Sequence, residues 1–250
     1  MMDEKGEVYL VGAGPGAPDL ITVRGREMIS KAEVIVHDSL IPMKLLSLAR
    51  EDAEIIDVGK RGGYHKVRQD GINQILVDKA LEGKRVVRLK GGDPFMFGRG
   101  GEEAEVLRSN GIRVHLVPGV TSPVSVPGLA GIPVTHRNMA STVTFVTGHE
   151  GAHKEDEIID WSSLARLGGT IVILMGVGHM RKNMTSLMEG GMDPSIPVAV
   201  VERGATKDQR TVTGTVEDIA DACERSEVGA PAIIIVGEVT RVRDLLGDLE

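Results

Sequence analysis

The chain has 250 residues, of which 41% are hydrophobic and 26% charged, and its formal net charge is −7 at pH 7. This composition predicts a globular protein of one large or two modest domains, because the length is ample for a buried core. No apolar run of about 18 residues occurs and the first residues are polar, so we expect no membrane span and no signal peptide, and the negative charge argues against a nucleic-acid-binding protein.

The first half of the chain alternates short apolar runs with helical patterns. Predicted strands cover Glu7–Val11, Glu33–Asp38, Glu54–Val58, Arg85–Lys90 and Val114–Val117. Helices are predicted after Asp19, which resembles an N-cap, near Met43–Ala49, and over Gln69–Leu81 and Gly101–Asn110. The alternation of strands and helices predicts an α/β domain with a mostly parallel, five-stranded sheet.

A segment rich in Pro, Gly and Ala runs from Pro123 to Pro133. We expect the domain junction just after it, giving an N-terminal domain over residues 1–136 and a C-terminal domain over 137–250. The second half then shows five predicted strands, with helices ending near Glu189 and over Val216–Glu224; the strands are Thr142–Thr147, Thr170–Met175, Pro197–Val201, Arg210–Thr215 and Ala232–Val236. We expect a mixed sheet in this second α/β domain.

Glycines and polar side chains follow many of these strands. Ligands bind at the carboxyl ends of strands in open α/β sheets, and glycine lets a backbone approach a ligand closely. A single glycine turn would more often only reverse the chain, but six such ends favour an active site in a cleft between the two domains. They are Asp38, Gly59–Arg61, Gly91–Asp93, Thr121–Ser122, Met175–Gly176 and Glu202–Gly204.

The charge is unevenly distributed along the chain. Residues 60–99 contain ten Lys or Arg and four acids, a balance of +6, so the remainder carries −13. This basic region in an acidic protein favours an anionic small molecule as substrate over a polymer backbone. The single cysteine, Cys223, excludes an internal disulfide and is expected to be a buried thiol. The histidines show no metal-ligand spacing, so we expect no metal site.

The loop Gly12-x-Gly14-x-Gly16 follows the first strand and invites comparison with dinucleotide-binding loops, with Asp38 placed to hold a ribose. Pro15 and Pro18 interrupt the direct entry into a helix, and the third glycine comes one residue early. An NAD-type oxidoreductase is therefore the weaker alternative.

Several segments together resemble the tetrapyrrole methylases. The likeness runs from about Glu7 to Leu245 and is carried by Gly12–Gly16, Val58–Arg61, Arg85–Glu103, Pro118–Ser122, Ala130–Arg137 and Val201–Gly204. Within the family, Arg85–Glu103 and Thr135–Arg137 are most similar to members that methylate uroporphyrinogen III. The chain departs from the usual pattern at Ala17, His37 and Asn138, where Asp, Tyr and Asp are common. We expect no fused dehydrogenase and ferrochelatase half of the kind found in bifunctional sirohaem synthases.

The resemblance implies methyl transfer from S-adenosylmethionine to carbons 2 and 7 of uroporphyrinogen III, giving precorrin-2 by way of precorrin-1 in sirohaem or cobalamin synthesis. It implies proton transfer by Asp38 and Lys60, although Lys60 could equally bind a substrate carboxylate. It also implies a cytoplasmic homodimer. The implied cofactor contacts are Pro15, Gly91, Gly92, Asp93, Met96, Thr121, Ser122, Met175 and Gly204.

Uroporphyrinogen carries eight carboxylates, which fits a basic region in an acidic protein. We expect charge-assisted hydrogen bonds to them, each contributing about 1.5–3 kcal/mol, from Lys60, Arg61, Arg99, His136, Arg137 and Arg203. The methyl donor is itself a cation, so backbone carbonyls of the glycine loops and Asp93 should surround it. The stretch Gly91–Met96 is thus expected to face the donor, and Arg99 with the basic residues before Gly91 to face the substrate.

Three alternatives stay open at this point. A sibling methylase could act on a later precorrin or on the diphthamide precursor of a protein. An NAD-type oxidoreductase would bind nicotinamide cofactor. A non-catalytic binding module would leave the strand-end loops of both halves without a purpose.

Overall fold

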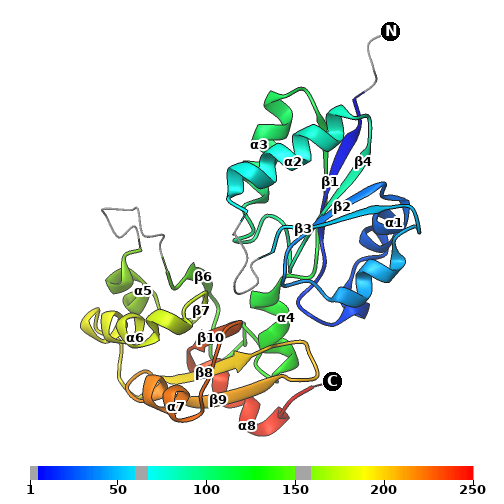
Figure 1. The fold of residues 1–250 in the computed structure, drawn as a ribbon. Helices are drawn as coiled ribbons and strands as arrows, with labels where there is room; N and C mark the ends of the chain where they lie inside the picture. The colour runs from blue at the N-terminus through cyan, green and yellow to red at the C-terminus, as the bar shows by residue number, and fades with distance from the viewer. Residues whose placement is uncertain (1–4, 60–66, 150–158, 250) are drawn as a thin grey trace. The chain divides into compact units, whose positions relative to one another are not determined.

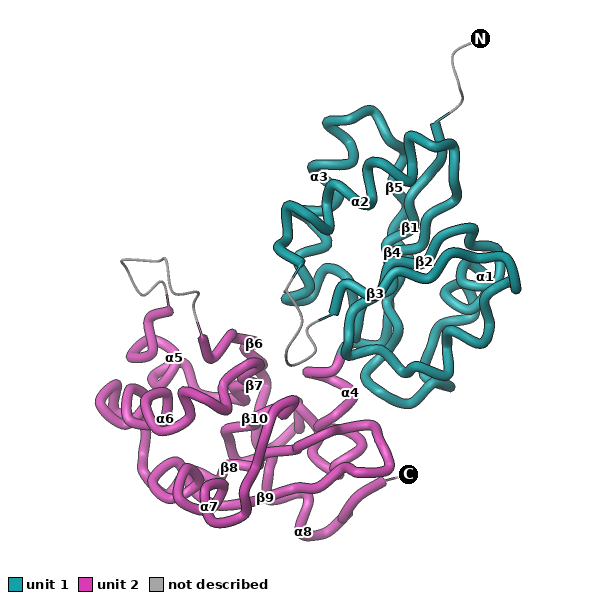
Figure 2. Tube along the Cα trace, in the orientation of Figure 1, with its two compact units in different colours: residues 1–121 teal, residues 122–250 magenta. Residues whose placement is uncertain are grey.

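A computed structural model describes residues 5–59, 67–149 and 159–249. The chain divides into two compact units, residues 1–121 and 122–250 (Figure 2), and each is described by itself. Among the described residues, none of the helices combines the length and the apolar character needed to cross a bilayer.

Unit 1 is built on a five-stranded sheet of order β3-β2-β4-β1-β5. All of its strand pairs are parallel, so the predicted parallel sheet is confirmed. The apolar runs of the sequence form the strands because a parallel sheet is buried on both faces. The strands are β1 (Glu7–Gly12), β2 (Val34–His37), β3 (Glu54–Asp57), β4 (Arg85–Lys90) and β5 (Arg113–Val117).

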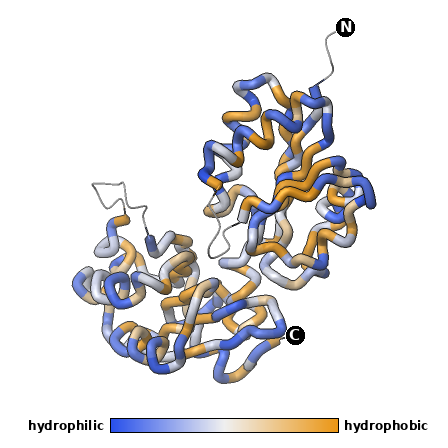
Figure 3. Tube along the Cα trace, in the orientation of Figure 1, coloured by the Kyte–Doolittle hydropathy of each residue, from blue (hydrophilic) through white to orange (hydrophobic). Residues whose placement is uncertain are grey.

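Helices cover both faces of this sheet (Figure 1). On one face, α2 (Gln69–Leu81) and α3 (Gly100–Ser109) bury Leu76 and Leu107 against Val8, Val36 and Val86. On the other face, α1 (Val23–Lys31) and the 3₁₀ helix η2 (Met43–Leu48) pack against the alternate strand residues. Figure 3 shows the strands of unit 1 as its most hydrophobic part.

The start of α1 differs from the prediction. Asp19 lies in a short 3₁₀ helix, η1 (Pro18–Leu20), and α1 begins only at Val23. Thr22 is the N-cap, and its Oγ1 accepts a hydrogen bond from the Gly25 amide at 3.1 Å. The chain does not continue from Asp19 into the helix because Ile21 and Thr22 are extended.

Unit 2 contains a second five-stranded sheet of order β6-β7-β10-β8-β9. Strands β6 and β7 are parallel, whereas β10 is antiparallel to both β7 and β8, so the predicted mixed sheet is confirmed. The strands are β6 (Val143–Thr147), β7 (Thr170–Leu174), β8 (Pro197–Glu202), β9 (Arg210–Thr215) and β10 (Ala232–Val236).

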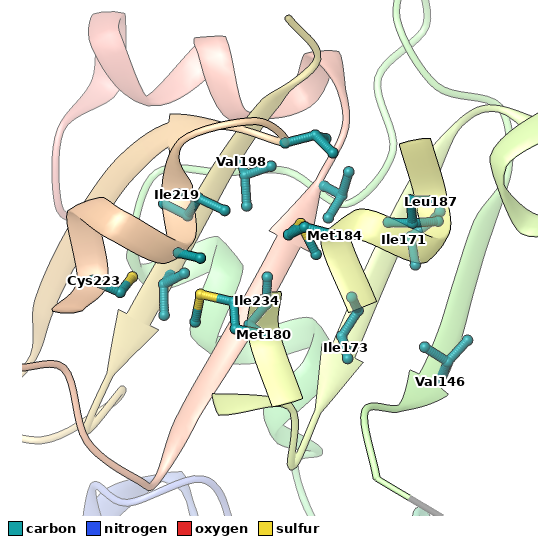
Figure 4. Close-up of a cluster of buried hydrophobic side chains, with 14 residues drawn as sticks. Val146, Ile171, Ile173, Met180, Met184, Leu187, Val198, Ile219, Cys223 and Ile234 are labelled. Atoms are coloured by element: carbon teal, nitrogen blue, oxygen red, sulfur yellow. The ribbon is translucent and has the colours of Figure 1, made fainter. Parts of the chain in front are cut away.

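One face of this sheet packs on α6 (Met180–Glu189) and α7 (Ile219–Arg225). Figure 4 shows Met180 and Met184 of α6 beside Ile234 of β10, with Cys223 of α7 at one side of the cluster. Cys223 is a free, buried thiol, as expected, and its burial raises the pKa to about 11. Shorter helices complete the unit; they are α5 (Trp161–Leu167), η3 (Val177–His179), η4 (Glu238–Val242) and α8 (Arg243–Leu246).

The segment rich in Pro, Gly and Ala, after which we expected the domain junction, is largely helical. Ser122–Leu129 forms α4, which contains Pro127 and contacts β7 and β10. The two units consequently meet at 121/122, whereas we expected the junction at 136/137. The difference arises because α4 packs on the second sheet, which a composition rich in Pro, Gly and Ala does not reveal.

Candidate active site

The loops of unit 1 that were predicted to form a site gather at one edge of its sheet. Because all five strands are parallel, their carboxyl ends lie at that edge. Pro15 follows β1, Asp38 follows β2, Gly91–Asp93 follows β4, and Thr121 comes shortly after β5. The structure therefore brings these predicted residues together, with half-buried Met96 in the loop after β4.

Four glycines let the loops after β1, β4 and β5 touch backbone to backbone. Gly14 and Gly92 form a bridge, in which the Gly92 amide donates to the Gly14 carbonyl at 2.7 Å. A Cβ on Gly12 would lie 2.5 Å from the Gly92 carbonyl oxygen, and one on Gly119 would lie 2.2 Å from the same atom. No other residue type fits at these positions without moving a loop.

We call this contact between the loops after β1, β4 and β5 the glycine junction. The carboxylate of Asp93 stabilises it. Its Oδ1 accepts from the Phe95 amide at 2.8 Å, and its Oδ2 accepts from the Gly119 amide at 3.0 Å. Asp93 thus joins the loop after β4 to the loop after β5. Both oxygens of the carboxylate thus serve to shape these two loops.

Asp38 is held by charged side chains of the neighbouring strand. Its Oδ1 accepts from Nη2 of Arg88 at 2.5 Å, and its Oδ2 lies 3.9 Å from Nζ of Lys90. Both cations also reach Oε1 of Glu103 on α3, at 3.1 and 3.0 Å. The Asp38 side chain is 32% exposed, whereas those of Arg88, Lys90 and Glu103 are at most 4% exposed.

This arrangement corrects part of the charge argument. Arg88 and Lys90 were expected to face the substrate with the other basic residues before Gly91, but their charges are buried and neutralised inside unit 1. Lys79, Lys84 and Arg85 point elsewhere as well, since they pair with Glu54, Glu33 and Glu7. The run of basic residues in the sequence therefore does not form one basic surface.

Arg99 is the predicted substrate-binding residue at the start of α3. It has a left-handed backbone (φ +60°), and its side chain is 55% exposed. The guanidinium binds the carboxylate of Glu102 through two contacts, of 3.0 and 2.6 Å. This pairing lowers the pKa of Glu102 and raises the pKa of Arg99, so both groups stay charged at neutral pH.

In unit 2, the ends of β7 and β8 lie at one edge of the sheet. Both strands run antiparallel to β10, which lies between them. Met175 follows β7, and Arg203 and Gly204 follow β8. The Met175 side chain is 57% exposed, so it is not a filler of the core. A Cβ on Gly204 would lie 2.2 Å from Val126 of α4, which explains the glycine there.

Backbone conformations mark the same loops. Among the described residues, six that are not glycine have positive φ, and five of them lie in strand-end loops singled out from the sequence or directly beside them: Phe97, Arg99, Met175, Arg203 and Ala205. Such conformations cost about 1–3 kcal/mol each and cluster at functional sites. The strain supports the assignment of these loops to a site.

Three further predicted residues, Ser122, His136 and Arg137, lie in unit 2. Ser122 begins α4. His136 is half-buried in a turn closed by two backbone hydrogen bonds with Ala140, of 3.0 and 2.9 Å, and Arg137 is exposed in the same turn. Lys60 and Arg61 lie outside the described residues.

The dinucleotide alternative finds no support in the glycine loop after β1. The loop leads into η1 and two extended residues before α1 begins, so no helix N-terminus follows the glycines directly. Asp38, which would have to bind a ribose, instead contacts Arg88.

Comparison with known proteins agrees with the geometry. The family model described as "Tetrapyrrole (Corrin/Porphyrin) Methylases" matches residues 7–220. The chain belongs to this family.

The following three proteins are similar to this methylase over nearly their full length. A protein of Methanosarcina barkeri named S-adenosyl-L-methionine-dependent uroporphyrinogen III methyltransferase is 53% identical, over 99% of this chain and 97% of the relative. A Methanocaldococcus jannaschii protein named uroporphyrinogen-III C-methyltransferase is 49% identical, over 96% and 98%. The crystal structure of a uroporphyrin-III C-methyltransferase from Thermus thermophilus, complexed with S-adenosylhomocysteine, has a TM-score of 0.82 and 40% identity, over 95% of this chain and all of that one.

The loops of this methylase suit a cationic methyl donor. Residues 91–98 contain no Lys or Arg, and Lys90 just before them is turned into the protein, where Glu103 binds it. The polar groups of this loop are its backbone carbonyls and the negatively charged carboxylate of Asp93, which accepts hydrogen bonds from the Phe95 and Gly119 amides. The residues present therefore fit S-adenosylmethionine.

Sequence reasoning missed the three buried charged residues beneath Asp38. The available signal was the pattern of β4, in which Arg88 and Lys90 alternate with Val87 and Leu89 after the strand has begun with Arg85 and Val86. Glu103 gave no signal, because an acid in the first turn of a helix is ordinary.

Proposed function

We propose that this chain transfers methyl groups from S-adenosylmethionine to carbons 2 and 7 of uroporphyrinogen III, and so makes precorrin-2 by way of precorrin-1 for sirohaem or cobalamin synthesis. Its similarity to two archaeal relatives with this named activity, over nearly the whole of each chain, carries the choice of substrate. The loops of unit 1 and the carboxylate of Asp38 supply groups that the reaction needs.

S-Adenosylmethionine, when bound, supplies an electrophilic methyl group on a positively charged sulfur. The glycine loops after β1, β4 and β5 are proposed to hold it so that a macrocycle carbon meets the methyl in line. Alignment of this kind can contribute about 7–11 kcal/mol. A C–CH₃ bond forms as the S–CH₃ bond breaks, and the electron pair of the broken bond stays on sulfur.

The methylated macrocycle must then lose a proton. Asp38 is the proposed acceptor, because its carboxylate is partly exposed at the carboxyl edge and fixed by Arg88. The proton passes to a carboxylate oxygen, and the electron pair of the broken C–H bond forms a C=C bond that neutralises the cation left on the macrocycle by methylation. Lys60 is proposed to bind a substrate carboxylate, and a proton-donating role would show as lost turnover with unchanged substrate affinity in Lys60→Ala.

Incubation with labelled S-adenosylmethionine and uroporphyrinogen III tests the proposal. We expect two labelled methyl groups per macrocycle. No incorporation would contradict the proposed substrate, and incorporation only into a later precorrin would assign the chain to a sibling activity. Titration with NAD in a calorimeter should give no heat of binding.

Arg99 is proposed to bind a carboxylate of the macrocycle through the donors that Glu102 leaves available. Removal of one charge-assisted hydrogen bond costs about 1.5–3 kcal/mol. Arg99→Leu should therefore raise the KM for uroporphyrinogen about 10–100-fold while the affinity for S-adenosylhomocysteine stays unchanged. Steady-state kinetics and calorimetry measure the two quantities.

Arg108→Leu is the matched control, because Arg108 is an exposed arginine at the far end of the same helix. It should leave the KM near the wild-type value. An equal rise in both variants would mean that only the overall charge of α3 matters, and would refute the specific role of Arg99.

We also propose that the enzyme is a cytoplasmic homodimer, as the family resemblance implies. Sedimentation of the purified chain would test the dimer, and fractionation of the cells that make it would test the location.

A further inference from the structure

Four charged side chains meet under the carboxyl edge of unit 1, in an arrangement that the proposed chemistry does not itself require. Arg88 and Lys90 point from β4 to the face covered by α2 and α3, and Glu103 meets them from α3. Gln69 of α2 adds a third donor to Glu103 Oε1, at 3.2 Å. Asp38 closes the group from the end of β2.

Burying this cluster of charged side chains inside the protein costs free energy. Burying charges requires desolvation, and apolar side chains of similar volume are often as stable as a buried ion pair. The neighbouring position on the same face of β4, Val86, packs in an apolar cluster with Val36 and Leu76. Apolar residues could thus occupy the face, and a requirement other than stability has to explain the charges.

The cluster points to Asp38 because that is its one partly exposed member. Arg88 reaches Asp38 Oδ1 through Nη2, while its Nη1 lies 3.4 Å from the carbonyl oxygens of Val36 and Leu89 and its Nε binds Glu103. The guanidinium therefore cannot rotate without losing several contacts. It fixes one oxygen of Asp38 and leaves Oδ2, at 3.9 Å from Lys90, in position to take a proton.

Glu103 balances the two cations. Its Oε1 accepts from Arg88, Lys90 and Gln69, and its buried Oε2 has no hydrogen-bond partner among the described residues. Burial, together with the charge of Arg88, lowers the pKa of Lys90. Other titratable side chains nearby are His37, whose Nδ1 lies 3.0 Å from the Asp38 carbonyl oxygen, Glu102, whose charge interacts with that of Lys90, and Arg99, whose charge interacts with that of Glu103.

We propose that Arg88, Lys90 and Glu103 are positioning residues, which hold the carboxylate of Asp38 in one orientation for proton transfer. The proposal rests on the proposed function, in which Asp38 accepts the proton from the methylated macrocycle. None of the three needs to touch the substrate. Their effect should appear in turnover and in its pH dependence, and not in ligand affinity.

The test compares the full-length wild type with Arg88→Met and Glu103→Gln. Both should bind S-adenosylhomocysteine with wild-type affinity and keep the KM for uroporphyrinogen within about threefold, while kcat falls about 10²-fold because the base is misplaced. The acid limb of the kcat–pH profile should move in opposite directions in these two variants. Loss of the Arg88 cation favours protonation of its neighbour and moves the limb to higher pH, whereas loss of the Glu103 charge moves it to lower pH.

Three further variants guard against a merely structural effect. The apolar triple variant Arg88→Met/Lys90→Met/Glu103→Leu should stay folded in urea titrations yet have low kcat, and Arg88→Lys should recover part of the activity. Lys79→Met is the matched control, since Lys79 is a cation of α2 paired with Glu54 and Glu82 at 2.9 and 3.4 Å, and its kcat should be unchanged.

Wild-type kcat in the triple variant would overturn the proposal. Identical pH profiles in Arg88→Met and Glu103→Gln, or losses of kcat that only follow the unfolded fraction, would also overturn it. A wild-type chain that does not label uroporphyrinogen III would instead overturn the proposed function, so the two failures are distinct.

Discussion

Asp38→Asn is expected to lower kcat about 10²–10⁴-fold, the range that a positioned general base contributes. The amide has the shape of the carboxylate but cannot accept the proton, and its contact with Nη2 of Arg88 loses the charge of one partner. The affinity for S-adenosylhomocysteine should be unchanged, because Asp38 follows β2 whereas the glycine junction joins the loops after β1, β4 and β5. Single-turnover kinetics with labelled methyl donor, followed by calorimetry, measure the two quantities.

Asp52→Asn is the control for this substitution. Asp52 also binds an arginine through two short contacts, of 2.6 and 2.5 Å to Arg50, but it is exposed and lies in the turn before β3. Its loss should leave kcat within about twofold, as surface ion pairs contribute little. If Asp38→Asn retained a tenth or more of the wild-type kcat, another group would have to be the base.

The parallel sheet of unit 1 could be predicted because its strands are apolar runs separated by helical patterns. The start of α1 and the helical conformation of α4 were harder to predict from the sequence. Asp19 and Thr22 are both good N-cap residues, and only the extended conformation of Ile21 and Thr22 decides between them. Likewise, α4 contains Pro127 and several small residues, so it is a helix that tertiary packing stabilises and propensity does not.

For the candidate site, the sequence predicts where the loops lie but not where the charged side chains point. Loops at strand ends can be located from sequence, since glycine and polar residues interrupt the apolar pattern there. The direction of a charged side chain is another matter. Arg88 and Arg99 both belong to the same basic run, yet one is buried beneath Asp38 and the other is exposed beside Glu102. The face of the strand and the partner across it decide this, and neither is visible in the order of residues.

Substitution of Gly119 in the glycine junction is the second change from which we expect a large effect. Gly119→Ala would place a Cβ 2.2 Å from the carbonyl oxygen of Gly92 and 2.7 Å from the Cα of Gly12, both of which are backbone atoms. Because no flexible side chain can move aside, the loops after β4 and β5 have to separate. That would also stretch the hydrogen bond from the Gly119 amide to Asp93. We expect the free energy of unfolding to fall by about 1–3 kcal/mol, and the affinity for S-adenosylhomocysteine to fall at least tenfold.

Gly101→Ala separates this steric effect from the general effect of a methyl group. A Cβ at Gly101 would meet no atom within 4 Å, and the position lies in the first turn of α3, so stability should be unchanged or slightly raised. Urea titration measures the free energy of unfolding of both variants, and calorimetry measures their affinity for S-adenosylhomocysteine. A Gly119→Ala protein with wild-type stability and wild-type affinity for S-adenosylhomocysteine would mean that the loops can separate freely. Retained stability with weakened ligand binding would instead show that the junction serves the cofactor and contributes nothing to the fold.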